Sequence, residues 1–312
     1  MSEVPCPVCA CTRGESIETI WHNTEQLAYV ACAECGLIQL LPRPTSQELA
    51  DYYADTFWPE HESSPQRQIQ KQAHRAAHIL RFTKGHLDRV RQRNPGGKVR
   101  ILEIGSSYGR TLRELGDYVA AAGGDPLLFG IEPSRHAMEV GRAYYANIRV
   151  IGSSIDDIAC HNTDPFDLII LSHVLEHLPA PVRSLERVAG SLARFGALYI
   201  EVPYYYGHPS TEYAHLFCFT EVSILNCLSR AGLRSTSVVV DGHDEPFPFY
   251  IKCLATKANG EMLPIRFESP QRIKMRRAAA MERFRAFRAA RPRTWPANGD
   301  PAAFPRIPNA IH

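Results

Sequence analysis

From Lys98 onward the chain alternates short apolar runs with amphipathic stretches, and this alternation limits the folds that it can adopt. The apolar runs are continuous, as strands buried on both faces require. Such strands separated by helices favour a doubly wound parallel α/β sheet. The pattern predicts strands at residues 99–104, 127–131, 148–151, 166–172 and 197–202, with helices at about 108–122, 135–145 and 182–193.

One more helix and two more strands complete the predicted sheet. The helix at 221–231 ends at Gly232, because glycine readily takes the left-handed conformation that follows a helix. Strands at 236–241 and 249–255 flank a turn-like segment and are expected to pair antiparallel at one edge. Residues 98–257 are therefore expected to form one core domain.

The segment before the core, residues 46–97, is predicted to be a helical linker or lid. Apolar residues recur every three or four positions between 68 and 93, which indicates a helix, and Asn94-Pro95-Gly96-Gly97 ends it. Ser46 is expected to cap a shorter helix. An aromatic cluster follows that helix and consists of Tyr52, Tyr53, Phe57 and Trp58.

Five of the nine cysteines fall within the first 35 residues, where four of them form two Cys-x-x-Cys pairs. A gap of two residues lets two thiolates converge on one ion, and two such pairs complete a tetrahedral site. Residues 1–45 are therefore expected to form a zinc ribbon with short strands at 17–21 and 27–31. Its predicted ligands are Cys6, Cys9, Cys32 and Cys35, with Cys11 as a competing ligand. Four thiolates leave no position for a substrate, so the Zn²⁺ would be structural; the alternative is reduced cysteines without metal.

Charge is unevenly distributed along the chain. From Arg266 onward there are 11 basic and 3 acidic residues, which leaves 24 basic and 30 acidic residues before it. An acidic body argues against nucleic acid as the main partner. Residues 258–312 are expected to form a basic helix at 271–291 and an extended tail. The arginines could bind an anionic ligand, a phosphate-rich partner or a second copy of the chain; the alternative is a solvated helix packed on the body.

Composition excludes several classes of protein. Hydrophobic residues at 45% and charged residues at 22% exclude a disordered chain. No apolar run approaches the ~20 residues that span a bilayer, and the first residues contain no apolar signal segment. We therefore expect a soluble cytoplasmic protein without a membrane partner.

A glycine-containing segment, Glu103-Ile104-Gly105-Ser106-Ser107-Tyr108-Gly109, joins the first core strand to the first core helix. Its spacing is Glu-x-Gly-x-x-x-Gly, which differs from the dinucleotide fingerprint Gly-x-Gly-x-x-Gly. The two glycines let the backbone approach a ligand closely. The next strand ends in Glu132, where a carboxylate can accept both hydroxyls of a ribose. Glu103 and Glu132 are therefore expected to face one ligand, although each alone could be an exposed loop acid.

The stretch from Val99 to about Thr256 resembles the class I S-adenosylmethionine-dependent methyltransferases. ILEIGSSYGRTL and FGIEPS are similar to their first and second motifs, FDLIILSHVLEHLPAP to their fourth-strand segment and LYIEVP to their fifth strand. The resemblance implies a Rossmann-like methyltransferase sheet with S-adenosylmethionine as the cofactor. It also implies that Glu132 holds the ribose and that Asp156 lies beside the adenine amine. The residues that it implies around the methionine portion and along the cofactor pocket are Glu103, Gly105, Ser106, Gly109, Ser172 and His173.

The order of a four-cysteine ribbon, a PRPTSQELADYY-like segment and this core resembles the deoxysugar C-methyltransferases. Those enzymes methylate a carbon beside the ketone of a nucleotide-linked sugar after a base removes its proton. Their Tyr-His-Glu-His-like segment corresponds here to Glu212–Phe219, in which His215 is retained and Ala214 replaces the glutamate. The family also has a second C-terminal domain, where this chain has only the basic helix and tail.

Histidines after the fourth and fifth strands are the candidate bases. A methyl acceptor that begins protonated needs a positioned base, and the ordinary pKa of histidine suits that task near neutral pH. His215 is the first candidate, and His177 and His208 are the others. Tyr213, with Tyr52 and Tyr53, is a candidate substrate contact; the alternative is that these tyrosines pack the ribbon against the core.

These features together predict a methyltransferase that acts on a sugar, nucleotide sugar or related small molecule, at carbon or oxygen. One alternative is a zinc-ribbon RNA methyltransferase, although a nucleic acid partner is not expected. Another is a non-catalytic assembly protein that keeps the cofactor fold. A homo-oligomer formed through the C-terminal helix is a further candidate partnership. Metal-dependent O-methylation would need a carboxylate cluster at the pocket mouth, which the sequence does not assemble.

Overall fold

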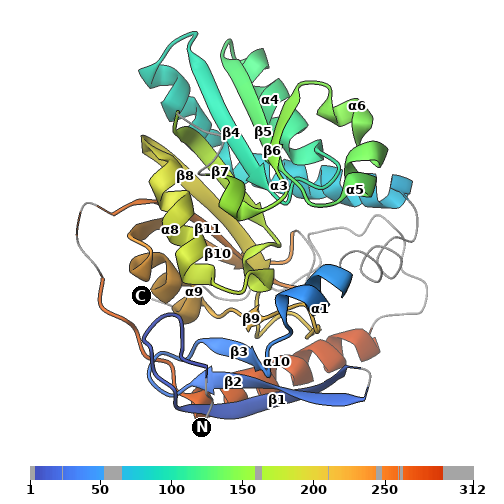
Figure 1. Ribbon diagram of the computed structural model, residues 1–312, viewed down its shortest axis with the longest axis vertical. Coiled ribbons are helices and arrows are strands. Elements are labelled where there is room, and N and C mark those ends of the chain that lie inside the picture. The colour runs from blue at the N-terminus through green and yellow to red at the C-terminus, as the bar shows by residue number, and fades with distance from the viewer. Residues whose placement is uncertain are drawn as a thin grey trace.

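Two β-sheets organise the chain in the computed structural model, which describes residues 4–22, 24–52, 65–158, 164–209, 211–243, 248–258, 260 and 263–290 (Figure 1). The larger sheet has seven strands in the order β10-β11-β8-β7-β4-β5-β6. They are β4 (Lys98–Ile104), β5 (Asp125–Ile131), β6 (Ile148–Gly152), β7 (Phe166–Ser172), β8 (Leu192–Pro203), β10 (Leu233–Asp241) and β11 (Tyr250–Lys257).

The larger sheet is mainly parallel, as the sequence predicts. β4 pairs in parallel with both β5 and β7, so the chain reverses its direction across the sheet between these two neighbours. β11 pairs antiparallel with β8 and with β10, which confirms the antiparallel pair expected at one edge. The reversal beside β4 creates the crevice where ligands bind in open α/β sheets.

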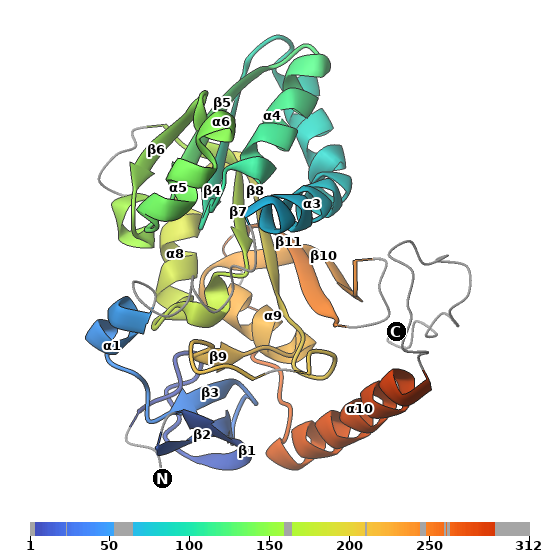
Figure 2. The same ribbon diagram turned by 90° about the vertical axis from the view of Figure 1, so that its right-hand side faces the viewer.

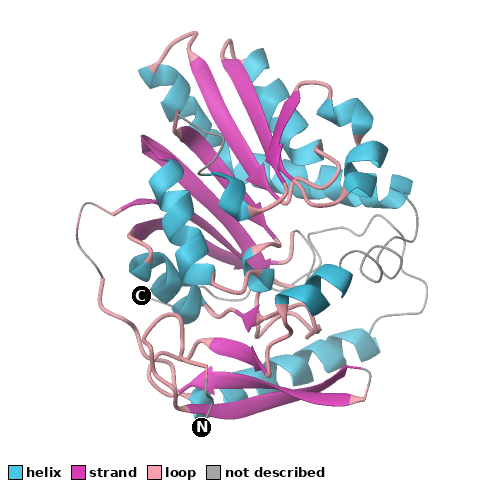
Figure 3. Ribbon diagram, viewed as in Figure 1, coloured by secondary structure: helices cyan, strands magenta, loops and turns pink. Residues whose placement is uncertain are grey.

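Helices cover both faces of the larger sheet (Figure 3). Alternate residues of one strand supply the two cores: Leu168 and Ile170 of β7 face one cluster, and Ile169 and Leu171 face the other. The first cluster includes α3 (Pro65–Arg93) and α4 (Arg110–Ala121), while the second includes α8 (Pro181–Ser191) and α9 (Glu221–Arg230). α6 (Arg142–Tyr145) packs against α4, and α5 (Arg135–Val140) precedes it.

The smaller sheet joins the N-terminal segment to a distant part of the chain. Its order is β1-β2-β3-β9, formed by β1 (Gly14–His22), β2 (Glu25–Cys32), β3 (Ile38–Leu41) and β9 (Phe217–Cys218). β3 pairs with β9 through Ile38 opposite Cys218 and Gln39 opposite Phe217. The sequence predicts β1 and β2 but neither β3 nor β9. β3 pairs with β2 as well as with β9, whereas the two residues of β9 form a strand only through this long-range pairing.

The C-terminal helix α10 (Pro270–Ala290) packs against β1 and β2 and lies alongside the smaller sheet in Figure 2. Gln271 Nε2 donates to Glu15 Oε2 over 2.7 Å, which ties the start of the helix to β1. The predicted tail beyond residue 290 lies outside the described residues.

Local details differ from the sequence expectation at three places. Thr45, rather than Ser46, caps α1 (Ser46–Asp51), because its hydroxyl accepts from the Glu48 N–H in a capping box. The helix predicted at 135–145 is divided at Gly141, where a side chain would collide with the Tyr108 carbonyl. α8 ends at Ser191 because β8 begins at once.

Among the described residues, no helix combines the length and apolar character needed to cross a bilayer.

Candidate active site

Glu103 is the penultimate residue of β4 and the first of the glycine-containing segment, and its side chain is buried. Its Oε2 accepts no hydrogen bond from the described residues, and burial raises the pKa of this carboxyl to about 8. Gly105 follows with a φ of 73°, and a side chain there would lie 2.7 Å from Val174 Cγ2. The buried acceptor and the side-chain-free position suit a ligand that brings its own donor, such as an ammonium group.

Glu132, after β5, faces the same segment from the next strand. Its carboxylate accepts from the Ser107 N–H over 2.7 Å and from the Ser134 N–H over 2.8 Å. Burial raises the pKa of Glu132, and these two N–H donors oppose that rise. The carboxylate is thereby fixed with lone pairs left for further donors, as ribose hydroxyls would be.

The loop between these two acids is held by neighbouring backbone. Ser106 is buried, and its N–H donates to the Ile131 carbonyl over 3.2 Å. Gly109 has a φ of 73° and precedes α4, so the loop turns into the helix at a position that favours glycine. Gln72 of α3 donates to Ser107 Oγ over 2.7 Å, which lays the long helix over the loop.

Asp156 does not join Glu103 and Glu132 at the glycine-containing loop. It belongs to a short 3₁₀ helix, η2 (Ile155–Asp157), and its side chain is 66% exposed and pairs with Arg187 Nη1 at 2.6 Å. Its neighbour Asp157 instead accepts from the Ser153 and Ser154 N–H groups. The structure therefore brings Glu103 and Glu132 to one loop and turns Asp156 toward α8.

The ends of β7 and β8 carry a buried cluster of histidines and carboxylates. His173 follows β7; its Nε2 lies 3.1 Å from Glu201 Oε1, and its Nδ1 lies 3.5 Å from Glu176 Oε1. Burial opposes a charge on His173, but the two carboxylates outweigh it and raise its pKa. His173 also has a φ of 55°, a strained backbone of the kind found at functional sites. Ser172 is buried beside it and donates to Glu201 Oε1 over 3.5 Å.

Glu201 is the centre of this cluster, and the sequence reasoning did not select it. Tyr199 donates to its Oε2 over 2.7 Å, and His243 Nε2 lies 2.9 Å from the same oxygen. His78 of α3 stacks on His243 with ring centroids 4.6 Å apart. The sequence feature that could have identified Glu201 is its position as the single charge within the otherwise apolar β8 segment LYIEVP.

A small cavity lies next to the cluster. Its lining includes Glu176, His215, His208 and Thr211, together with Tyr205 and Phe217. Burial and the neighbouring His177 lower the pKa of His215 to about 3, so its imidazole is neutral at pH 7. Burial opposes the charge on Glu176, yet His173 and His177 hold its pKa at about 2. The cavity wall therefore presents a neutral imidazole beside an ionised carboxylate.

His177 belongs to a second 3₁₀ helix, η3 (Leu175–His177), and its ring lies 4.9 Å from that of His215. Tyr213 lies outside the cavity lining. Its ring stacks on His22 of β1 with centroids 3.6 Å apart and meets Tyr52 edge to face at 5.8 Å. Tyr213 and Tyr52 thus contact the smaller sheet, while Tyr53, Phe57 and Trp58 lie outside the described residues.

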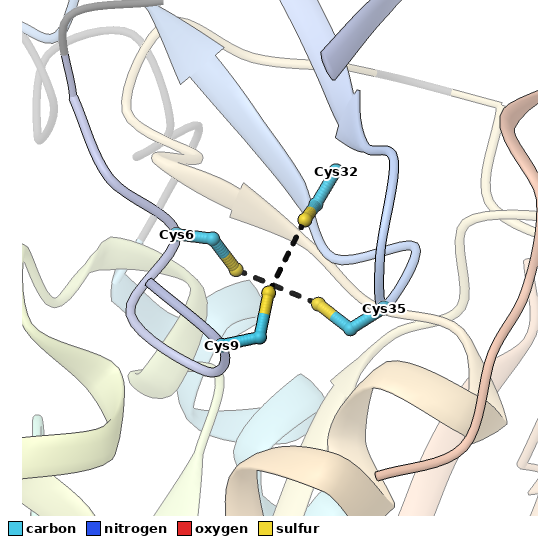
Figure 4. A group of neighbouring side chains, drawn as sticks. All are labelled: Cys6, Cys9, Cys32 and Cys35. Carbon is cyan, nitrogen blue, oxygen red and sulfur yellow. Dashed lines mark hydrogen bonds between the residues drawn. The ribbon is translucent and has the colours of Figure 1, made fainter. Parts of the chain in front are cut away.

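The four cysteines converge on one point of the smaller sheet (Figure 4). Cys6 Sγ lies 3.5 Å from Cys35 Sγ, and Cys9 Sγ lies 3.5 Å from Cys32 Sγ. All four sulfurs lie within 4.8 Å of one another. Four sulfurs at this spacing fit the donor set of a tetrahedral Zn²⁺ site. Cys11 lies apart and bonds with Arg13.

The smaller sheet supports the cavity directly. The Tyr29 hydroxyl of β2 lies 2.8 Å from the Glu212 carbonyl and 3.0 Å from the His215 carbonyl. From the other side, the Arg277 guanidinium of α10 donates to the carbonyls of Tyr205 and His208. The loop that carries His215 and His208 is therefore positioned by the smaller sheet and by α10 as well as by β8.

Comparison of the sequence with known families gives one match that covers more than half of the chain. Residues 66–238 match the profile of the family described as methyltransferase domain. That range includes α3, the glycine-containing loop, Glu132, the histidine cluster and α9. No curated protein matches the sequence.

Solved structures share the fold at low sequence identity. A 1,6-didemethyltoxoflavin-N1-methyltransferase from Burkholderia thailandensis, with S-adenosylhomocysteine bound, has 16% identity and a TM-score of 0.50, over 78% of this chain and 100% of that one. A magnesium protoporphyrin IX methyltransferase from Synechocystis PCC 6803 has 13% identity and a TM-score of 0.47, over 69% and 100%. A pericyclic reaction enzyme has 10% identity and a TM-score of 0.41, over 53% of this chain, which spans 44% of that one. The likeness to the Burkholderia enzyme shows the shared fold.

Proposed function

We propose the activity of this chain from the premise that it belongs to the methyltransferase domain family, as a class I S-adenosylmethionine-dependent methyltransferase. It transfers the methyl group of S-adenosylmethionine to a small-molecule acceptor that binds in the cavity beside His215. The observation that carries the proposal is the pair of buried carboxylates, Glu103 and Glu132, at successive strand ends around one glycine-containing loop.

Each part of the cofactor has a matching group in this loop. The unpartnered oxygen of Glu103 suits the methionine ammonium group, and the fixed carboxylate of Glu132 suits the two ribose hydroxyls. Gly105 leaves room for the methionine portion, and we assign Ser172 and His173 to the cofactor pocket, as the resemblance implies. We keep Asp156 as the proposed adenine contact, which requires its side chain to leave Arg187.

The residue that removes the acceptor's proton is, in this proposal, His215, with His177 and His208 as alternatives. His215 lines the cavity and is uncharged at neutral pH, so its lone pair can accept a proton. Tyr213 acts on the acceptor only through the loop that it shares with His215, because it stacks on His22. The acceptor is a sugar, nucleotide sugar or related molecule, methylated at carbon or oxygen; the retained His215 and the ribbon-first order of the chain support this class.

We further propose that Cys6, Cys9, Cys32 and Cys35 bind one structural Zn²⁺. When bound, the ion cross-links the two Cys-x-x-Cys turns at the start of the chain and after β2. With four thiolates around it, the ion has no position for substrate, so its contribution is to the smaller sheet.

Calorimetric titration with S-adenosylhomocysteine tests the cofactor assignment. We expect binding in the micromolar range for the wild type and loss of about 10-fold or more for Glu132→Ala, because the ribose hydroxyls lose a charged acceptor. Glu139→Ala, on the neighbouring helix α5, is the matched control and should bind like the wild type. Failure of the folded wild-type protein to bind would contradict the methyltransferase proposal and favour the non-catalytic assembly protein.

A further inference from the structure

A second group of metal-binding side chains lies beside the cavity, apart from the four cysteines. Glu176, His177 and His215 each offer one ligand atom, and these atoms lie within 4.8 Å of one another. Glu176 and His177 come from η3, whereas His215 comes from the loop before β9. Tertiary structure thus assembles a carboxylate and two imidazoles that are separated in the sequence.

Glu176 is a buried carboxylate that lacks a hydrogen-bond donor among the described residues. Its side chain is 1% exposed, and neither oxygen accepts a hydrogen bond from any residue in the described ranges. Its nearest positively ionisable neighbours are His173 Nδ1 at 3.5 Å and His177 Nε2 at 3.9 Å. A buried carboxylate left in this state is costly, and a cation within the cluster would satisfy it.

The orientation of His177 is that of a metal ligand. Its Nδ1 lies 2.9 Å from the Ala214 carbonyl, and since a carbonyl only accepts, Nδ1 must carry the proton. The other ring nitrogen, Nε2, lies 3.9 Å from Glu176 Oε1 and is the atom that a neutral imidazole would offer to an ion. Metal-binding histidines in proteins commonly donate their other ring N–H to a backbone carbonyl in this way.

Surrounding groups hold the other two side chains. His173 lies between Glu176 and Glu201, so one imidazole orients the carboxylate and is itself anchored. The His215 carbonyl lies 3.0 Å from the Tyr29 hydroxyl, and the His215 N–H donates to the Glu212 carbonyl over 3.0 Å. The three groups are therefore fixed close together before any ion binds.

We propose that Glu176, His177 and His215 bind a divalent transition-metal ion whose open positions face the adjacent cavity and take an oxygen atom of the acceptor. Two imidazoles and one carboxylate suit Zn²⁺, Mn²⁺ or Fe²⁺ better than Mg²⁺ or Ca²⁺, which prefer oxygen ligands. Three protein ligands leave room for substrate, in contrast to the closed four-cysteine site.

This inference deepens the proposed function and rests on it only for the role of the bound oxygen. An ion at this place would lower the pKa of a bound hydroxyl, whose proton would pass to water, so His215 would serve as a ligand instead of accepting that proton. The acceptor would then be a molecule with a hydroxyl or carbonyl oxygen near the methylated atom. Metal binding itself does not depend on methyl transfer, and the two can be measured separately.

The test is a titration with Mn²⁺ of the full-length protein that carries one Zn²⁺ per chain, with electron paramagnetic resonance used to measure the free Mn²⁺. Thiolates select Zn²⁺ over Mn²⁺, so the four-cysteine site should not respond. We expect one Mn²⁺ per wild-type chain and a loss of about 100-fold or more in affinity for Glu176→Gln and His177→Ala. His208→Ala removes a histidine of the same cavity that is outside the three ligands, and it should keep the wild-type affinity.

Three outcomes would overturn the inference: no Mn²⁺ binding by the wild type, unchanged binding by Glu176→Gln, or equal loss in His208→Ala. Each variant is first titrated with S-adenosylhomocysteine, which reports whether the larger sheet is folded. A protein that binds S-adenosylhomocysteine but no Mn²⁺ rejects only the metal site. A protein that binds Mn²⁺ but no S-adenosylhomocysteine rejects the proposed function and leaves the metal site in place.

Discussion

Buried acids at the carboxyl edge of the larger sheet differ in what surrounds them, and this determines their charge. Glu201 and Glu176 have histidines within ion-pair distance, and these hold the pKa of each carboxyl below its usual range although burial opposes it. Glu103 has no such partner, so burial dominates and its pKa rises. The first two are ionised at neutral pH, whereas Glu103 gains its full charge only above its raised pKa or with a cationic ligand.

Glu103→Gln should stabilise the ligand-free protein at high pH. The pKa of Glu103 is about 8 in the folded chain against an ordinary value of 4.5, so unfolding releases a proton between these pH values. Wild-type stability therefore falls as pH rises through that window, and it falls no further above it. We expect the variant and the wild type to unfold alike at pH values near 4.5 and to differ by a few kcal/mol, on the order of 1.4 per pKa unit, above pH 8.

Denaturant unfolding without cofactor, at the two ends of this window, measures the difference. Glu186→Gln on the exposed face of α8 is the matched control and should show the same difference from the wild type at both pH values. A Glu103→Gln variant that is no more stable than the wild type at high pH would mean that the buried carboxyl is stabilised in its charged form.

At the scale of elements, the loop between β8 and β9 is positioned from outside its own sheet. β9 is only two residues long, yet it completes the smaller sheet by pairing with β3. The Tyr29 hydroxyl of β2 is fully buried and lies within hydrogen-bond distance of two carbonyls of the loop. The position of His215 therefore depends on an element of the N-terminal segment.

Tyr29→Phe should weaken this connection while keeping the aromatic ring. Removing the buried hydroxyl takes away the one donor that the Glu212 and His215 carbonyls share, although the Glu212 carbonyl still accepts from the His215 N–H. We expect a loss of about 1–3 kcal/mol in the free energy of unfolding and a lower kcat. Tyr118→Phe is the matched control: its hydroxyl donates to Asp88 over 2.8 Å between α4 and α3, at a half-buried position. Chemical denaturation and methyl-transfer rates measured on both variants test this expectation. An unchanged kcat in Tyr29→Phe would argue against the positioning of the His215 loop by β2.

On the scale of the whole molecule, the two sheets support different parts of the candidate site. The loop with Glu103 and Glu132 belongs to the larger sheet alone, whereas the cavity wall needs the smaller sheet and α10. Figure 1 shows the smaller sheet and α10 at the far end from β4, β5 and β6, with β9 between them and the larger sheet. Cofactor binding and acceptor binding should therefore respond differently to damage in the N-terminal segment.

Cys9→Ser tests this division. The substitution removes one of four thiolates, so we expect weaker Zn²⁺ retention, a disturbed smaller sheet and a kcat about 10-fold lower or more. Binding of S-adenosylhomocysteine should stay within about 3-fold of the wild type, because Glu103 and Glu132 are in the larger sheet. Cys11→Ser, a neighbouring cysteine outside the four, is the control and should change neither. Equal loss of cofactor binding in Cys9→Ser would mean that the two sheets fold as one unit.

The sequence by itself determined the elements of the larger sheet, because their periodicity is local. Continuous apolar runs predicted every strand of that sheet, and the strand at 166–172 has the bounds that the pattern indicates. The carboxylates at strand ends, Glu103 and Glu132, were also readable, since parallel strands bring their carboxyl ends to one edge. The paired cysteines were readable from their spacing alone, and the structure brings their sulfurs together.

Only the tertiary structure decided how the histidines are grouped and what their charges are. His173, Glu201 and His243 come from β7, β8 and the turn after β10, and nothing in their spacing indicates that they meet. The same holds for β9, whose two residues become a strand only because β3 offers an open edge. A pKa depends on burial and on neighbours distant in sequence, so the neutral His215 and the ionised Glu176 could be identified only after folding had placed them together.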